Sequence, residues 1–129
     1  MKRNASNYER DLLRRLWDLG FVAFRIAGSG SSSYPSADVI AVKSGKVYVF
    51  EVKTTRSNRV YINQSQLWEL EKILSEGIDV FVAVRFIGSL REWRLLKLQD
   101  VLEHGKVSIE LAKEKGMRIE ELASQVKKS

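Results

Sequence analysis

The chain has 129 residues, of which 44% are hydrophobic and none is cysteine; this is the size of one ordinary domain with a single core. The absence of cysteine excludes a disulfide framework and a thiolate zinc site, and no N-terminal run is apolar enough to predict a signal peptide or a membrane helix. We therefore expect one domain over residues 1–129, in a cytoplasmic protein without membrane contacts.

The net charge of +6 is unevenly distributed along the chain. Residues 1–60 carry 11 lysines and arginines against 5 acidic residues, whereas residues 61–129 carry 11 against 11. An excess of basic residues fits a polyanionic partner, because neutralising phosphates releases their counterions. A surface that is charged only for solubility explains the excess equally well.

The first predicted element is a helix over residues 6–20, where leucines recur at helical spacing and a glycine stands at the end. A strand over residues 20–26 follows. The next segment, GSGSSSYPSAD over residues 28–38, has the composition of a loop. We expect its residues 28–36 to be mobile and to order only on binding, because they offer little apolar area to offset the entropy of ordering.

Two runs of alternating residues, 38–43 and 46–53, are separated by the dipeptide Ser-Gly and predict a β-hairpin. A two-residue turn there pairs Val42 with Val47. Four residues further along the hairpin, the same register places Asp38 directly opposite Glu51.

The later elements are a short strand over 60–62, a helix over 63–76, a strand over 78–87, a strand over 92–98 and a helix from Ile119 onward. The run at 78–87 is almost continuously apolar, which is typical of a strand covered on both faces. This order of elements predicts an α/β domain with a central mixed β-sheet flanked by α-helices.

The carboxylates of the hairpin suggest a metal site. Since side chains alternate along a strand, Lys53 lies on the same face as Glu51. Directly opposed carboxylates destabilise a sheet unless something compensates their charge, and a cation is the obvious compensation. Mg²⁺ takes oxygen ligands and commonly meets phosphate. The alternative is structural: Asp38 ends a loop, and Glu51 pairs with Lys53 at a solvated sheet edge.

Two other polar residues have a structural and a functional interpretation. Glu9 forms a potential capping box with Ser6, but it also continues the core-facing stripe, where a carboxylate needs a partner. We expect Glu9 to be a metal ligand or to support one. Gln66 forms a potential capping box with Asn63, and there the structural interpretation is favoured.

Four motifs occur in order over about residues 5–75: YERDLLRRLWDLGFVAFRIAGSG, PSAD before an apolar strand, FEVK, and QSQL in a helix. With these motifs the chain resembles the archaeal Holliday junction resolvases of the PD-(D/E)xK nuclease superfamily, although PSAD replaces a strict Pro-Asp. The resemblance implies a restriction-endonuclease-like fold. It also implies a homodimeric, Mg²⁺-dependent endodeoxyribonuclease that resolves four-way DNA junctions in recombination and repair. Mn²⁺ is a possible substitute, and no nucleotide cofactor is implied.

The resemblance also assigns roles to individual residues. The metal would be held by Asp38 and Glu51, assisted by Glu9 and the carbonyl of Val52. Lys53 would orient the attacking water or help to deprotonate it. Six residues are expected to contact DNA, and Ser29 is counted among the catalytic residues as well: Arg10, Arg25, Ser29, Ser31, Arg56 and Arg59.

Two alternatives remain at this point. One is a PD-(D/E)xK nuclease with another target in restriction, repair or RNA processing. However, 129 residues leave no spare domain for base readout, so recognition of DNA shape is the simpler account. The other is a non-catalytic nucleic-acid-binding module of the same fold, which would be marked by loss of the Asp, Glu or Lys that are all present here.

Overall fold

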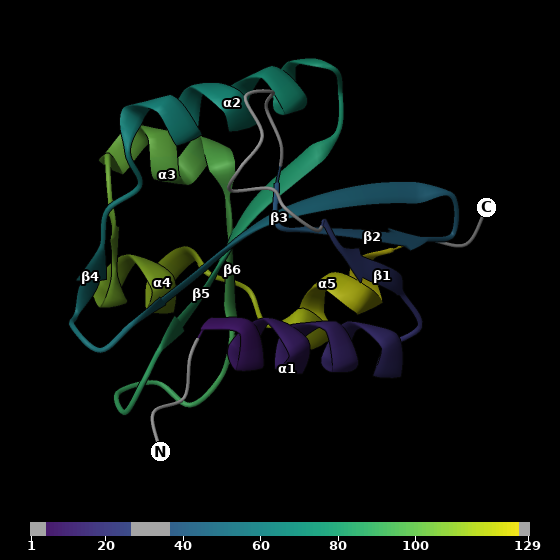
Figure 1. The fold of residues 1–129 in the computed structure, drawn as a ribbon, viewed down its shortest axis with the longest axis horizontal. Helices are drawn as coiled ribbons and strands as arrows, with labels where there is room; N and C mark the ends of the chain where they lie inside the picture. The colour runs from purple at the N-terminus through teal and green to yellow at the C-terminus, as the bar shows by residue number, and fades with distance from the viewer. Residues whose placement is uncertain (1–4, 27–36, 127–129) are drawn as a thin grey trace.

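A computed structural model describes residues 5–26 and 37–126, and its elements are shown in Figure 1. The helices are α1 (Ala5–Asp18), α2 (Gln64–Ser75), α3 (Leu98–His104), α4 (Ile109–Lys115) and α5 (Ile119–Gln125). The strands are β1 (Val22–Arg25), β2 (Val39–Lys43), β3 (Lys46–Thr55), β4 (Arg59–Val60), β5 (Asp79–Phe86), β6 (Arg94–Lys97) and β7 (Val107–Ser108). The segment 28–36, with Ser29 and Ser31, lies outside the described residues, so the expected mobility of that segment stays a prediction.

The main sheet has the strand order β1-β2-β3-β5-β6, and β4 pairs with β7 in a separate small sheet. Within the main sheet β3 and β5 are parallel, whereas the other neighbouring pairs are antiparallel. Helices α1 and α5 lie against one face, and α2 and α3 lie against the other (Figure 1). The predicted mixed sheet flanked by helices is therefore confirmed.

The position of β5 between two helical layers explains why its sequence is continuously apolar. Val80, Val82 and Val84 pack into the core beneath α2 and α3. Phe81 and Ala83 point to the other face and pack into the core beneath α1 and α5. A strand covered on both faces needs apolar residues at every position. The prediction for this run is therefore confirmed.

The hairpin between β2 and β3 has the predicted register. Val42 pairs with Val47, and Ile40 pairs with Val49. The connecting residues Ser44 and Gly45 both have positive φ, of 52° and 79°. Two such residues form the tight turn whose twist matches that of the flanking strands, so the turn fixes the register across the whole hairpin.

Helix α1 buries the leucine stripe that predicted it, since Leu12 and Leu16 are fully buried. Its start corrects one detail of the sequence interpretation. The helix already includes Ala5, so Ser6 lies inside it and not at its N-cap. The side chain of Glu9 forms an ion pair with Arg25 on β1, so the core-facing stripe and not a capping box explains this glutamate.

The sequence did not reveal α3, β7 or α4. Both helices have seven residues, too few for a clear helical period, and α3 begins directly after β6 with no turn residue between them.

Among the described residues, no helix combines the length and apolar character needed to cross a bilayer.

Candidate active site

Asp38 lies where β2 begins, beyond the last ladder pair, Val39 with Phe50. Its backbone N–H donates to the Phe50 carbonyl at 3.1 Å. Its carboxylate accepts a hydrogen bond from the Val52 N–H at 2.8 Å. The expected direct pairing of Asp38 with Glu51 is therefore wrong in detail. The side chain of Asp38 replaces the missing backbone of β2 as the partner of β3.

Glu51, Lys53 and Gln66 form a compact polar cluster between β3 and α2. Glu51 is only 5% exposed, and its Oε2 accepts a hydrogen bond from Gln66 Nε2 at 3.0 Å. Lys53 Nζ lies 3.7 Å from the same oxygen and donates to Gln66 Oε1 at 3.1 Å. Glu51 and Lys53 are thus neighbours on one face of β3, as the alternation predicted.

Gln66 corrects the capping-box interpretation. Asn63 is the N-cap of α2, and its side chain accepts from the Gln66 backbone N–H at 2.8 Å. The Gln66 side chain does not return to the cap but joins Glu51 to Lys53. Sequence reasoning therefore missed Gln66 as a residue of the site. The available signal was its place in the first turn of the helix that follows the Glu-x-Lys strand.

The electrostatics of this cluster favour the binding of a cation. The pKa of Glu51 is raised to about 7 by burial and by the negative charge of Asp38, and Lys53 lowers it only in part. A buried carboxyl with this pKa is stabilised in its ionised form by an added positive charge. Binding of a metal ion at Glu51 would therefore be coupled to the loss of its proton.

The charges of Arg25 and Asp38 also act on the pKa of Glu9. Burial raises its pKa, Arg25 lowers it, and the charge of Asp38 raises it again. Within residues 5–26 and 37–126, however, no three Asp, Glu, His or Cys side chains are close enough to hold an ion together. In this structure Glu9 is engaged by Arg25, and its role as a metal ligand stays a prediction.

The backbone supplies a further oxygen that suits a hard cation. The N–H and C=O of one residue on a strand point to the same side. Because the Val52 N–H points to Asp38, the Val52 carbonyl points to that side as well, where β2 has ended. Two carboxylates and this carbonyl match the oxygen ligands that Mg²⁺ prefers, with waters completing its coordination.

The predicted DNA-binding arginines come from several elements of the fold. Arg25 leaves β1 toward Glu9. Arg10, on the exposed side of α1, donates to the Asn7 side chain at 2.9 Å. Arg56 and Arg59 are exposed in the connection from β3 to β4 and at the start of β4. Binding of DNA by these four arginines stays a prediction.

Comparison with known proteins decides the family. All 129 residues match the family described as archaeal Holliday junction resolvase (Hjc). The chain belongs to this family. A crossover junction endodeoxyribonuclease Hjc from Sulfurisphaera tokodaii is 33% identical over 129 residues, covering 97% of this chain and 89% of that one. The corresponding Hjc protein of Archaeoglobus fulgidus is 32% identical over 100 residues, covering 77% of this chain and 72% of the relative.

A solved structure supports the same assignment. The 1.6 Å structure of Archaeoglobus fulgidus Hjc, described as a Holliday junction resolvase from an archaeal hyperthermophile, superimposes with a TM-score of 0.81 at 28% identity. The match covers 92% of this chain and 99% of the other. The expected restriction-endonuclease-like fold is confirmed. In the present chain, the polar cluster of Glu51, Lys53 and Gln66 lies toward the carboxyl end of β3.

Proposed function

We propose that this protein is an endodeoxyribonuclease that resolves four-way DNA junctions by metal-dependent phosphodiester hydrolysis. The observation that carries the proposal is the convergence of Asp38, Glu51 and Lys53 at one end of β3 in a chain of the resolvase family. The relatives named above are described as crossover junction endodeoxyribonucleases. A non-catalytic module would have no need of a buried carboxyl beside a second one.

Asp38, Glu51 and the Val52 carbonyl would hold Mg²⁺, and Mn²⁺ also suits such oxygen ligands. When bound, the ion supplies Lewis acidity at a phosphoryl oxygen and lowers the pKa of a bound water. We assign Glu9 a supporting position beside this pair, because the charge of Asp38 acts on it.

The side chains around the ligands perform the remaining tasks. Lys53 is held by Gln66, with its ammonium facing the Glu51 carboxylate. From there it orients the attacking water and stabilises the hydroxide that attacks phosphorus. Arg25 and Arg10 bring positive charge to the phosphoryl oxygens, where negative charge develops in the transition state. Hydrolysis needs only water as the second reactant, so no nucleotide cofactor is required.

A homodimer follows from the substrate. Resolving a four-way junction requires two incisions, placed in strands related by the approximate two-fold symmetry of the junction. A two-fold dimer provides two identical active sites with matching symmetry. We therefore propose that one protomer cuts one strand and its partner cuts the other.

The deciding assay uses a labelled four-way junction and a linear duplex of matched sequence, each with and without Mg²⁺. Paired incisions in the junction, dependent on Mg²⁺ and absent from the duplex, support the proposal. Equal cleavage of both substrates favours a nuclease of the same superfamily with another target. Binding of the junction without cleavage at any Mg²⁺ or Mn²⁺ concentration favours a non-catalytic module.

A further inference from the structure

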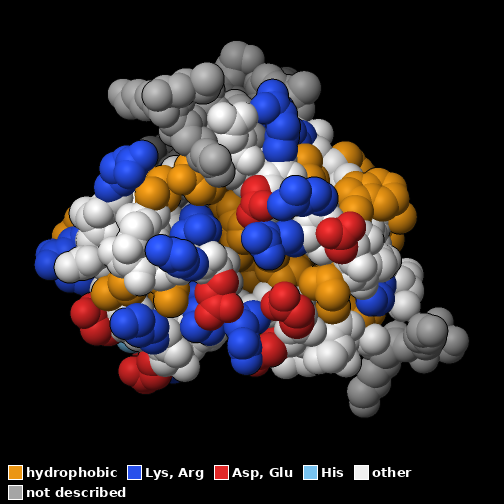
Figure 2. Space-filling view, turned by 90° about the horizontal axis from the view of Figure 1, so that it is seen from below, with side chains coloured by type: hydrophobic (Ala, Val, Ile, Leu, Met, Phe, Trp, Pro, Cys, Tyr) orange, Lys and Arg blue, Asp and Glu red, His pale blue; other side chains and the backbone are white. Residues whose placement is uncertain are grey.

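The exposed side of α1 carries two further arginines beside Arg10. Arg10, Arg14 and Arg15 come from this helix, and Arg14 and Arg15 keep 68% and 49% of their side-chain surface exposed. The face of the molecule seen from below, where α1 lies in Figure 1, shows many lysine and arginine side chains interspersed with acidic ones (Figure 2). We call Arg10, Arg14 and Arg15 the α1 arginine row.

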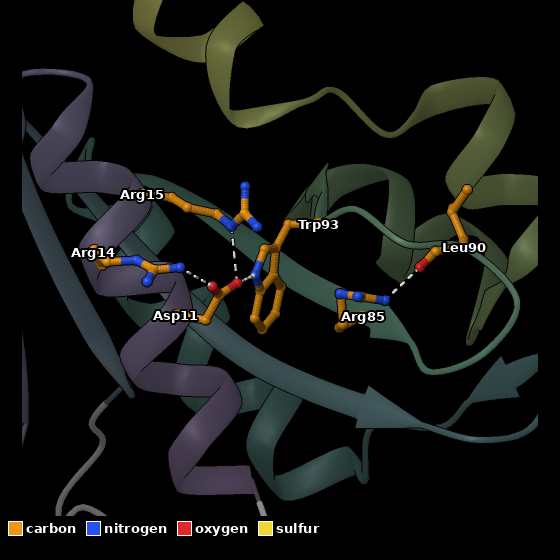
Figure 3. Close-up of polar contacts among 6 residues, drawn as sticks. All are labelled: Asp11, Arg14, Arg15, Arg85, Leu90 and Trp93. Atoms are coloured by element: carbon orange, nitrogen blue, oxygen red, sulfur yellow. Dashed lines mark hydrogen bonds and ion pairs between the residues drawn. The ribbon is translucent and has the colours of Figure 1, made fainter. Parts of the chain in front are cut away.

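One carboxylate fixes two members of this row (Figure 3). Asp11 Oδ1 accepts from Arg14 Nη2 at 2.8 Å, and its Oδ2 accepts from Arg15 Nε at 2.9 Å. The same Oδ2 also accepts from the indole N–H of Trp93 at 2.9 Å. Trp93 precedes β6 and is only 2% exposed, so Asp11 is anchored to the core of the domain.

This arrangement holds guanidinium groups ready for an external anion. Each guanidinium has five N–H donors, and the hydrogen bonds to Asp11 use one on Arg14 and one on Arg15. A shallow surface hollow is lined by Asn7, Arg10, Asp11 and Arg14. Arg14 and Arg15 share the single carboxylate of Asp11, so these three side chains keep one net positive charge after their ion pairs are counted.

The row lies on the same helix as Glu9, which neighbours the candidate active site. Helix α1 begins beside the active site, where Glu9 pairs with Arg25 and feels the charge of Asp38. Arg10 and Arg14 are separated by about one helical turn, ~5.4 Å. Successive phosphates of one strand advance by about 3.4 Å along the duplex axis, so the spacing of Arg10 and Arg14 matches a distance of one to two nucleotides.

We propose that the α1 arginine row binds the phosphate backbone of the duplex arm that leaves the active site, and that Asp11 positions Arg14 and Arg15 for this contact. The inference rests on the proposed function. To Arg10, which the proposed function already places at the phosphoryl oxygens, it adds a contact surface formed by Arg14 and Arg15, which have no part in the chemistry of cleavage.

The test compares Arg14→Gln/Arg15→Gln with the wild type on a four-way junction in EDTA, where binding is measured without cleavage over a series of salt concentrations. The log–log salt slope should fall by about 0.9 for each phosphate that is no longer neutralised, so by up to ~1.8 for the pair. Arg14→Lys/Arg15→Lys keeps both charges and should keep most of the slope. Lys115→Gln, which removes one charge paired with Asp100 on α3, controls for the loss of a positive charge outside the row and should leave the slope unchanged.

A second measurement locates the contact. Single phosphates near the cut are replaced in turn by uncharged methylphosphonates. Replacing a phosphate that Arg14 or Arg15 contacts should weaken binding by the wild type but not by Arg14→Gln/Arg15→Gln. These phosphates should lie one to two nucleotides from the phosphate that Arg10 contacts. An unchanged salt slope, an equal fall of the slope in Lys115→Gln, or the same interference pattern in both proteins overturns the inference.

These outcomes are separable from failure of the proposed function. A wild-type protein that cuts no junction in Mg²⁺ contradicts the proposed function. A protein that cuts junctions while Arg14→Gln/Arg15→Gln binds them with unchanged affinity contradicts only the role of the row. In that case the row serves an acidic protein partner or no partner at all.

Discussion

Replacing Glu51 by Gln is expected to stabilise the metal-free protein at neutral and alkaline pH. The buried carboxyl has a pKa of about 7 in the folded protein, against an ordinary value of 4.5. At ~1.4 kcal/mol per pKa unit, this difference corresponds to ~3 kcal/mol. Gln retains an oxygen that can accept the hydrogen bond from Gln66, so the substitution removes the charge with little loss of packing.

The sign of the pH effect follows from proton linkage. Below about pH 4.5, Glu51 is protonated in both the folded and the unfolded chain, so it carries no ionisation penalty. As the pH rises toward 7, the unfolded chain releases this proton first, and the free energy of unfolding falls. The penalty is complete above the folded pKa of about 7.

Urea unfolding in EDTA at pH 4.5 and pH 8 measures this penalty. Glu51→Gln should lose about 3 kcal/mol less than the wild type between these two pH values, as the linkage argument requires. Glu103→Gln, at an exposed position on α3, controls for the loss of one charge. If the free energy of unfolding falls equally in the wild type and in Glu51→Gln between the two pH values, ionisation of the buried Glu51 does not destabilise the fold. Added Mg²⁺ should raise the melting temperature of the wild type but not that of Glu51→Gln, because an ion that binds only the folded state stabilises it.

Three further substitutions test neighbouring contacts. Asp38→Asn should abolish junction cleavage while junction affinity in EDTA stays near that of the wild type, since its amide oxygen can still accept from the Val52 N–H; cleavage at the wild-type rate excludes Asp38 as a ligand. Gln66→Leu should lower kcat about 10- to 100-fold, a typical cost of losing an outer-shell hydrogen bond at a metal site, and an unchanged kcat in single-turnover assays contradicts a positioning role. Asp11→Ala should lower the free energy of unfolding by about 1–3 kcal/mol, because the buried indole N–H of Trp93 loses its acceptor; chemical denaturation measures this, and a neutral result shows that another acceptor replaces it.

The sequence was most informative where structure depends on neighbours along the chain. The register of β2 and β3 depends on a two-residue turn, and one short dipeptide was enough to predict it. The two-sided burial of β5 appeared directly in its unbroken apolar run. In both cases the physical cause acts over a few consecutive residues, so the pattern was visible without any tertiary contact.

The details of the site depend on contacts between distant segments. Gln66 has the local pattern of a capping residue, but the carboxyl of Glu51 on β3 is the partner that its amide group meets. Asp11 and Trp93 are 82 positions apart, and no periodicity links them. Asp38 was expected to continue the ladder, whereas its carboxylate takes the Val52 N–H beyond the end of β2. A sequence pattern cannot reveal which of several available partners a polar side chain finds in three dimensions.

The strand that carries Glu51 has a neighbour on each side, since β3 lies between β2 and β5. Its amide protons are therefore expected to exchange with solvent among the slowest in the protein, because central strands open only in large cooperative units. The arginine row of α1 lies on the outer surface and is not subject to this restraint. Substitutions can therefore vary the charge and length of side chains on the surface of α1 without displacing Glu51 on the central strand.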